Sequence, residues 1–431
     1  MPEPRRYERA LRLGLVVLLV ALGVLSFHRA TREKFDFHHF YLDARYVWDH
    51  GGLNPNVVPF PRSDEDRQLP FYLPTVPTAL APITALGRVP AALLWSVAQV
   101  AALGYSLRVL RRWGVAEHAN PTEAALRTTL VFAVATAVAL PAFIEAARFN
   151  QLSFFVLAML LGGLSALDRN QPWVAGGILA AAAVLKLLPL VFLPWLLLKR
   201  RWSAAVAFVL AGAALLVLPP LLAFGPQRTA EYQRQWWELN ARGDSARGLL
   251  NMDLPEHFIN HRNQSIVQVL ARWTWAAHRY PTPWQPVQLA PETSRGIAAG
   301  ITAALGIALL VSTRRAWPQL SVRRRHAEAA VYMLGLMVFS PLLRQYYLVW
   351  AFPAVVLFAQ LAAHVESARE RWIGRAGLLI WLAGMLAWIR PEPRLMGAHL
   401  LMLIVLGVFL LWGTAAERRA VSTAPAPAPS A

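Results

Sequence analysis

The chain has 431 residues, contains no cysteine, and carries charge on only 15% of its residues. The absence of cysteine excludes disulfides, thiolate metal sites and cysteine nucleophiles. Soluble domains have about a quarter of their residues charged. The low charge, together with 56% hydrophobic residues, therefore predicts a membrane protein. Repeated apolar runs, each long enough to cross a lipid bilayer, favour a polytopic arrangement.

Acidic residues are also scarce, 24 against 42 lysines and arginines, which gives a net charge of +18. Such an excess is typical of nucleic-acid-binding proteins, but here much of it falls in short clusters at the ends of apolar runs. This is the positive-inside pattern, in which basic residues mark the cytoplasmic ends of membrane helices. We therefore expect no nucleic acid among the partners. The clusters are Arg5/Arg6, Arg111/Arg112, Lys199/Arg200/Arg201, Arg314/Arg315, Arg323/Arg324/Arg325, Arg369/Arg371/Arg375 and Arg418/Arg419.

The apolar runs predict an all-α polytopic bundle of about twelve transmembrane helices with a cytoplasmic N-terminus. Segments 173–186 and 187–199 are either two spans or one broken helix. We expect a single membrane domain over residues 1–415 and a disordered cytoplasmic tail over 416–431, which is rich in alanine and proline. The expected helices cover residues 11–27, 90–110, 124–146, 151–167, 173–186, 187–199, 203–223, 295–313, 327–343, 346–363, 372–389 and 395–412.

Two long loops, 28–89 and 224–294, fall on the outer side of this arrangement. Both mix aromatic residues with acids, arginines and prolines. Loops longer than about fifteen residues in a compact protein are usually functional. The inner loops are short, so we expect any chemistry on the extracytoplasmic side.

The first outer loop opens with EKFDFHHFYLDARYVW, residues 33–48. If this segment is helical, Asp36, His39, Phe40 and Asp43 share one face. A carboxylate at the membrane–water boundary can act as a general base toward an alcohol. Two alternatives remain open. The segment is an interfacial amphipathic helix with its aromatics among the headgroups, or Asp36, His39 and Asp43 share a metal ion.

A predicted hairpin at the outer edge of the membrane carries Glu145, Arg148, Asn150 and Gln151. Polar groups at this depth are costly unless they face a cavity or each other. They are candidates for a binding site. The competing interpretation is a simple Glu145–Arg148 ion pair at spacing i, i+3.

Several cations and amides in outer positions suit a phosphate group or sugar hydroxyls. Lys186 lies in a strongly apolar run, three residues before Pro189, and needs an anionic partner or a route to the interface. Arg344 lies at the outer edge between two helices and is either a phosphate ligand or an interfacial anchor. The second outer loop adds the donors His261, Arg262, Asn263 and Gln264.

Six segments, taken in chain order, resemble glycosyltransferase family 87. That family includes polyprenyl-phosphate-mannose-dependent α-mannosyltransferases. The resemblance implies a GT-C architecture, a multi-pass helical bundle with an extracytoplasmic active site beside the outer leaflet. The segments are FDFHHFYLDARYVWDHGGLNPN, LPFYLPTVPTALAPI, RFNQLSFFVLAMLLGGLSAL, AGGILAAAAVLKLLPLVFLPWLLLKRRW, RNQSIVQVLAR and SPLLRQYYLVWAFPAVV.

The resemblance also implies residue roles. Asp36 matches the acid of the family's first loop and would be the general base that deprotonates the acceptor. Lys186 matches the lysine of a K-x-x-P element, and Asn263 and Gln264 match an N-Q-S element. The chain departs from the family at residues 340–347, SPLLRQYY, where members often carry S-P-I-S-W followed by histidine. This departure leaves the donor sugar open.

The function implied is the inverting transfer of one sugar, mannose by the resemblance, from a polyprenyl-phosphate donor to a lipid-linked or glycan acceptor. No metal or other cofactor is expected, because lysine or arginine can stabilise a departing phosphate monoester. The expected location is the bacterial inner membrane, among membrane lipids. Beside the base Asp36, the candidate sugar and acceptor ligands are His39, Asp43, Asn150, Gln151, His261, Asn263 and Gln264, and the candidate phosphate ligands are Lys186, Arg262 and Arg344.

Two other functions fit a helical bundle with buried charges. A transporter or flippase of lipid-linked sugars would show inverted repeats and polar sites at the middle of the membrane. Here the polar residues concentrate in the two outer loops instead. An O-antigen ligase or polymerase would use an undecaprenyl-pyrophosphate donor and would also suit the arginines of the second loop.

Overall fold

The computed structural model describes residues 4–32, 36–55, 57–58, 67–68, 72–113, 121–238, 262–274, 287–364 and 367–413. Within these ranges the chain is almost entirely helical. The strands are a parallel pair of two residues each, β1 (Val57–Val58) and β2 (Arg67–Gln68). The predicted all-α class is therefore confirmed. The proposed tail, 416–431, and the candidate ligand His261 lie outside the described residues.

Six helices in the described part of the chain are long and apolar enough to cross a membrane, so the chain is a multi-pass membrane protein. Four further apolar segments are shorter than this limit, and the predicted total of about twelve spans stays a prediction. The six are α1 (Pro4–Ala30), α4 (Arg88–Trp113), α5 (Pro121–Phe149), α9 (Trp202–Trp237), α12 (Pro291–Ser312), and η4 (Gln345–Ala351) continued by α14 (Phe352–His364).

Every predicted helix overlaps an observed one, with first and last residues shifted by up to seven positions except at the end of α9. The predicted helix over 327–343 lies earlier in the chain, as α13, because the polypeptide leaves the helical conformation before Pro341. The other elements are α2 (Asp36–His50), α3 (Thr75–Thr84), α6 (Ser153–Asp168), α7 (Pro172–Leu185), η1 (Leu188–Val191), α8 (Phe192–Leu198), α11 (Ile266–Thr274), η3 (Trp317–Gln319), α13 (Val322–Val338), α15 (Ala368–Leu386), α16 (Pro391–Leu395) and α17 (Ala398–Gly413).

The open question about residues 173–199 is resolved as two helical arms joined by a turn. α7 ends at Lys186, whose side chain reaches Gln151 before the first turn of α6. After α8 the chain has returned to the other end of α6, where Arg201 donates to the backbone carbonyl of Leu167 at 3.1 Å. The arms α7 and η1–α8 therefore run in opposite directions.

The core of the bundle lies where α5, α6, α7, α13 and α14 pack together, and it buries large side chains such as Trp195 and Trp350. Glycine brings two helix pairs into close contact. A Cβ at Gly176 of α7 would overlap the carbonyl oxygen of Ala204 in α9, and one at Gly374 of α15 would overlap the backbone of α14. Small residues of this kind let membrane helices approach closely.

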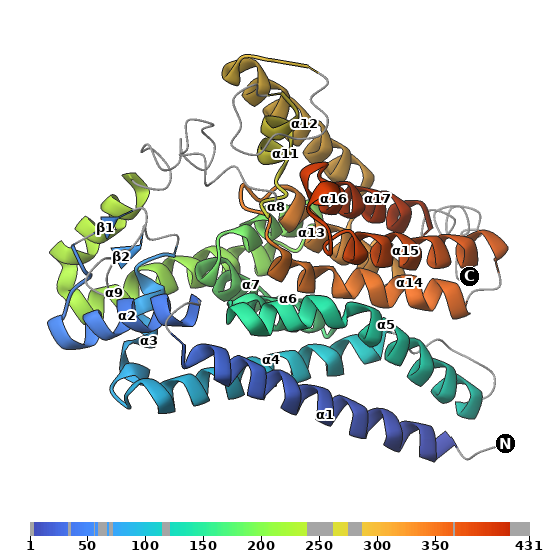
Figure 1. Ribbon diagram of the computed structural model, residues 1–431, viewed down its shortest axis with the longest axis horizontal. Coiled ribbons are helices and arrows are strands. Elements are labelled where there is room, and N and C mark those ends of the chain that lie inside the picture. The colour runs from blue at the N-terminus through green and yellow to red at the C-terminus, as the bar shows by residue number, and fades with distance from the viewer. Residues whose placement is uncertain are drawn as a thin grey trace, which may run out of the picture.

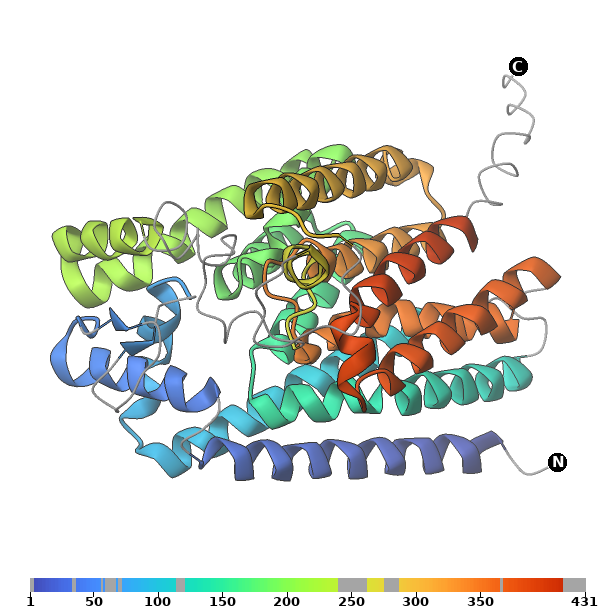
Figure 2. The ribbon, with the colours of Figure 1, turned by 45° about the horizontal axis from the view of Figure 1, so that its top comes forward.

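Helix α9 continues beyond the point where the sequence predicts an end near residue 223. Its backbone breaks at Gly225 (φ 76°, ψ 173°) and then continues to Trp237. This outer arm packs on the first loop, where Tyr232 Oη accepts from the Leu53 amide at 3.2 Å and Arg228 donates to the Gly51 carbonyl at 3.2 Å. In both views α2, α3 and this arm lie together at the end of the bundle opposite the N-terminus (Figures 1 and 2).

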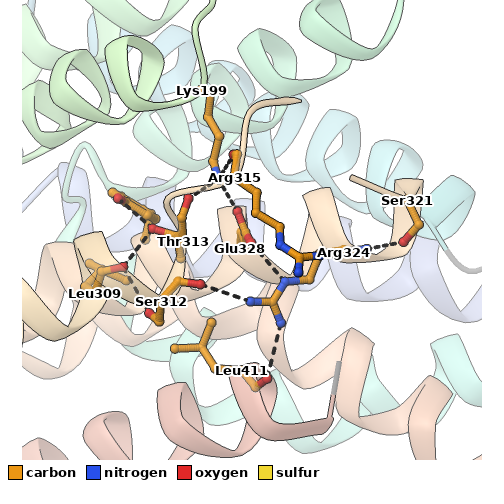
Figure 3. Close-up of polar contacts among 10 residues, drawn as sticks. Lys199, Leu309, Ser312, Thr313, Arg315, Ser321, Arg324, Glu328 and Leu411 are labelled. Atoms are coloured by element: carbon orange, nitrogen blue, oxygen red, sulfur yellow. Dashed lines mark hydrogen bonds and ion pairs between the residues drawn. The ribbon is translucent and has the colours of Figure 1, made fainter. Parts of the chain in front are cut away.

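The opposite end, which we call the basic end, carries described arginines such as Arg111, which pairs with Glu8. A buried charge network lies at the ends of α8 and α12 and at the start of α13 (Figure 3). Lys199 is fully buried and donates to the Glu328 carboxylate and to the Thr313 carbonyl. The guanidinium of Arg324 pairs with the Glu328 carboxylate at 2.9 Å and donates a hydrogen bond to the Leu411 carbonyl at 3.2 Å. The network therefore joins α8, α12, α13 and α17.

Candidate active site

Asp36 is the first residue of α2 and its side chain is half-buried. The segment is helical, which is the condition under which Asp36, His39, Phe40 and Asp43 are expected to share one face. A carboxylate in the first turn of a helix is stabilised by the helix dipole. Gln151 Nε2 donates a hydrogen bond to Asp36 Oδ2. Burial raises the pKa of the Asp36 carboxyl above its ordinary value, and the Gln151 hydrogen bond and the neighbouring charges of His39, Lys186 and Arg344 offset part of that rise.

Gln151 is the centre of this site. Its side chain is buried. Its Oε1 accepts hydrogen bonds from Tyr72 Oη at 3.1 Å and from Lys186 Nζ at 3.3 Å, and its Nε2 donates one to Asp36. One carboxamide thus joins α2, the segment before α3, the start of α6 and the end of α7. These segments are far apart in sequence, and the hydrogen bonds of Gln151 hold them together in the fold.

Asn150 fixes the position of Gln151 without facing the site itself. Its backbone has a positive φ of 55°, which asparagine tolerates better than most residues. Its Oδ1 accepts from Ser26 Oγ at 2.6 Å and from Gln99 at 3.3 Å, and its Nδ2 donates to the Ser26 carbonyl at 2.9 Å. The side chain is fully buried. The structure therefore places Asn150 in the packing between α1, α4 and α6, and its predicted role as a sugar ligand stays a prediction.

Lys186 turns inward at the end of α7, where its backbone is extended (φ −155°, ψ 119°). Besides Gln151, its ammonium lies over the ring of Tyr347, 3.9 Å from the centroid. Tyr347 is itself stacked on Trp350 at 4.9 Å between centroids. A lysine held between an amide oxygen and an aromatic face lies where a cation–π contact stabilises its charge.

Arg344 completes the positive side of the site. It is half-buried immediately before η4 and lies near enough to Asp36 for its charge to act on that carboxyl. Asn263 holds the segment that leads to it, because its Oδ1 accepts from the Leu343 amide at 3.0 Å and its Nδ2 donates to the Pro341 carbonyl at 3.3 Å. Gln264 adds a backbone hydrogen bond to Leu343 at 2.9 Å.

The side chains of Asn263 and Gln264 in the N-Q-S element form hydrogen bonds with other segments of the chain. Asn263 and Gln264 are both buried, and Gln264 Nε2 donates to the Arg394 carbonyl at 2.7 Å. Both are predicted to bind sugar, and that role stays a prediction; the contacts that the structure shows run to the segment before Arg344 and to Arg394. Arg262, by contrast, is exposed, and it lies near Arg394.

His39 and Asp43 lie one and two turns after Asp36 on α2, and both are half-buried. Burial lowers the pKa of His39 below its ordinary value, although the nearby Asp36 carboxylate opposes that change. Among the described residues, no three histidine or acidic side chains gather closely enough to share a metal ion, so Asp36, His39 and Asp43 do not form such a group. The Glu145–Arg148 pair is present, at 3.2 Å.

Two aromatic residues belong to the site although the sequence analysis did not assign them a role. Tyr72 hydrogen-bonds Gln151 and packs edge-to-face on Phe40 at 4.9 Å. Tyr347 lies under Lys186. Both occur in segments that carry the family resemblance, LPFYLP and SPLLRQYY, and their position in those segments was the available signal.

Comparison with known proteins decides the family. The sequence model of glycosyltransferase family 87 matches residues 70–341, which is more than half of the chain. The chain belongs to this family. It is a membrane glycosyltransferase, and the match includes Tyr72, Gln151 and Lys186 but begins after Asp36.

The other comparisons give little further information about the function of this family 87 glycosyltransferase. No curated protein matches the chain. Among solved structures, the crystal structure of ArnT from Cupriavidus metallidurans in the apo state is similar at 16% identity and a TM-score of 0.39, over 93% of this chain and 77% of that chain. That likeness is too weak to carry residue roles from one protein to the other.

Proposed function

We propose that the chain transfers a single sugar from a polyprenyl-phosphate donor to a hydroxyl of a lipid-linked or glycan acceptor, with inversion at the anomeric carbon. The sugar expected from the family resemblance is mannose. The observation that carries this proposal is the pair of contacts made by Gln151, which places a carboxylate and an ammonium on one carboxamide. A base for the acceptor and a cation for the departing phosphate are the two groups that this reaction needs.

The chemistry divides between the two sides of Gln151. Asp36 accepts the proton of the acceptor hydroxyl, whose oxygen forms the new bond to the anomeric carbon. The bond from that carbon to the phosphate oxygen breaks on the opposite face, and the electron pair leaves with polyprenyl phosphate. Lys186 and Arg344 stabilise the charge that develops on this phosphate. Asn150 and Asn263 act as positioning residues for Gln151 and Arg344.

The proposed location of the reaction is the extracytoplasmic face of the bacterial inner membrane, within a GT-C type bundle. Two observations support this side. α2, whose first residue is Asp36, lies at the end of the bundle opposite the N-terminus (Figure 1). The basic end holds the clusters that mark a cytoplasmic face, such as Arg111, which pairs with Glu8 at 3.0 Å. A reporter fused after Ala431 should be accessible from the cytoplasm alone, and accessibility from outside would reverse the assignment.

The function is tested with purified protein, an acceptor lipid extract and labelled polyprenyl-phosphate sugars. We expect release of polyprenyl phosphate with the label in a product of inverted configuration, with no requirement for added metal. A matched reaction with a polyprenyl-pyrophosphate donor distinguishes a ligase or polymerase. Transfer from the pyrophosphate donor alone would contradict the proposal, as would movement of intact donor without hydrolysis or transfer.

A further inference from the structure

A pocket opens at the basic end, between α4, α6 and α13, with a volume of about 420 Å³. Its lining includes Arg108 and Arg112 of α4 and Arg169, which follows α6. Gln151 lies at the other end of α6, so this pocket is separate from the proposed transfer site. Pockets that hold small ligands are commonly of this size.

The three arginines present their positive charge to the pocket. Arg108 and Arg112 are one helical turn apart, so they lie on the same face of α4, and all three side chains are exposed. Within the described residues none of these guanidinium groups forms a hydrogen bond or an ion pair. Three like charges around one pocket repel each other unless an anion lies between them.

The acid that lines the pocket is already paired. Asp168 accepts from His326 Nε2 at 3.1 Å, and its other oxygen lies 3.9 Å from Arg325. The His326 ring is stacked on Trp113, with 4.1 Å between centroids and an angle of 5° between planes. Asp168 is therefore engaged by His326 and Arg325, and the three arginines remain available to an outside anion.

An apolar stripe on α4 leads to the pocket. Leu94, Val97 and Tyr105 are exposed by 47%, 58% and 41% and follow one another along the face that ends at Arg108. An exposed apolar face on a membrane helix contacts acyl chains, while tyrosine and arginine at its end lie at headgroup depth. The stripe therefore offers an apolar face to acyl chains, and the pocket at its end offers three arginines to a headgroup.

We propose that this pocket binds the phosphate group of an anionic phospholipid in the leaflet at the basic end. Arginine suits this ligand, because its guanidinium donates two parallel hydrogen bonds to phosphate oxygens. A soluble phosphate compound has the same group but no acyl chains, and the apolar stripe favours the lipid source.

The test measures phosphatidylglycerol bound to detergent-purified protein by native mass spectrometry. The pocket variant is Arg108→Gln with Arg112→Gln, and the matched control is Arg314→Gln with Arg315→Gln. The control removes two exposed arginines that follow α12 and do not line the pocket. Melting temperature and elution volume verify that each variant is folded, and Arg169→Gln supplies a second, single change in the pocket.

We expect one saturable phosphatidylglycerol on the wild type and on the control. Affinity should fall by at least about tenfold in the pocket double variant, since each surface arginine contributes roughly 1 kcal/mol toward an anionic lipid. Phosphatidylcholine and inorganic phosphate, added alone, should bind far more weakly. Equal loss in pocket and control variants would show binding to charge in general and overturn the proposal. Equal binding of inorganic phosphate would assign the pocket to a soluble ligand and overturn it too.

Discussion

Asp36 and Lys186 bind opposite ends of the same carboxamide, that of Gln151. Gln151 donates to the carboxylate and accepts from the ammonium, so neither contact can form if the amide is flipped. This arrangement fixes the proposed base and the proposed phosphate ligand relative to each other. A change at residue 151 should therefore alter both proton transfer and donor binding.

The pH dependence of transfer should reflect the burial of Asp36. The base works in its ionised form, so activity is present above its pKa and is lost as pH falls through it. Because burial raises that pKa, the acid limb of kcat/KM should lie at higher pH than an ordinary aspartate would give. Gln151→Glu places a second carboxylate beside Asp36 and should move the acid limb to still higher pH.

The control for this shift is Gln99→Glu. Gln99 is also a glutamine, but its hydrogen bond is to Asn150, the neighbour of Gln151, and not to Asp36. The control variant should lower the melting temperature without moving the acid limb. An acid limb in the ordinary aspartate range for the wild type, or no movement in Gln151→Glu, would remove Asp36 from the role of base.

Lys186 should act on the donor rather than on the acceptor. Lys186→Met retains the length of the side chain and removes its charge, so donor KM should rise about 10-fold to 100-fold, the worth of one charge-assisted hydrogen bond. Lys186→Arg should recover only part of the loss, because Tyr347 lies 3.9 Å from the ammonium and leaves little room for a guanidinium. Steady-state kinetics with donor and acceptor varied separately make the measurement. A change confined to acceptor KM would contradict the assignment.

Asn263 should behave as a positioning residue. Asn263→Ala removes the contacts to the Leu343 amide and the Pro341 carbonyl, and should lower the free energy of unfolding by about 1–3 kcal/mol. Asn263→Asp retains the acceptor for Leu343 but replaces the donor by a buried carboxylate oxygen facing the Pro341 carbonyl, so it should recover neither the stability nor the donor affinity. Thermal unfolding and donor KM should change together. Lost acceptor affinity with unchanged stability would indicate direct sugar binding instead.

Glu328 should matter for stability alone. Glu328→Gln leaves Lys199 and Arg324 buried without a counter-charge, and such a loss costs about 3–5 kcal/mol. Asp49→Asn is the control, because its pair with Arg45 is 38% exposed on both sides and exposed pairs contribute about 0–1 kcal/mol. Thermal unfolding should separate the two variants, while transfer per folded molecule remains at the wild-type level. Equal melting temperatures would show that the network contributes little.

The sequence predicts helices well wherever an apolar run extends over several turns, as in α4, α5 and α14. It predicts the end of α9 wrongly. Pro219, Pro220 and Pro226 around Gly225 are strong signals for termination, yet the helix resumes after the break because its outer arm packs on residues near Gly51 and Leu53. That packing is a tertiary contact between residues far apart in the chain, which no local pattern encodes.

The candidate site is predictable in its charged members and less so in its amides. Asp36, Lys186 and Arg344 stand out in the sequence because a charged side chain in or beside the membrane is costly unless it has a partner or a function. Asn150, Gln151 and the N-Q-S pair carry equal weight in the sequence, but only Gln151 faces the other site residues. Ser26, the partner of Asn150, is 124 residues away in the sequence, and Pro341, the partner of Asn263, is 78 residues away. The orientation of each amide is therefore decided by the fold.

Lys199 illustrates the same limit at the basic end. In the sequence it is one of a cluster with Arg200 and Arg201, and the positive-inside pattern places all three in contact with water. The structure buries Lys199 completely against Glu328. The rarity of lysine in a chain so rich in arginine was the one local feature that set it apart.

The most direct test of the central claim is the rate of sugar transfer by Asp36→Asn, measured beside Asp49→Asn. Both changes replace a carboxylate of α2 by an amide, but Asp49 is exposed and paired with Arg45 at 2.7 Å, far from Gln151. Asp36→Asn should reduce transfer by about 10²-fold to 10⁴-fold, the usual worth of a positioned general base, with donor binding and melting temperature largely unchanged. Asp49→Asn should be indistinguishable from the wild type. Retained transfer in Asp36→Asn, or loss in Asp43→Asn instead, would contradict the account.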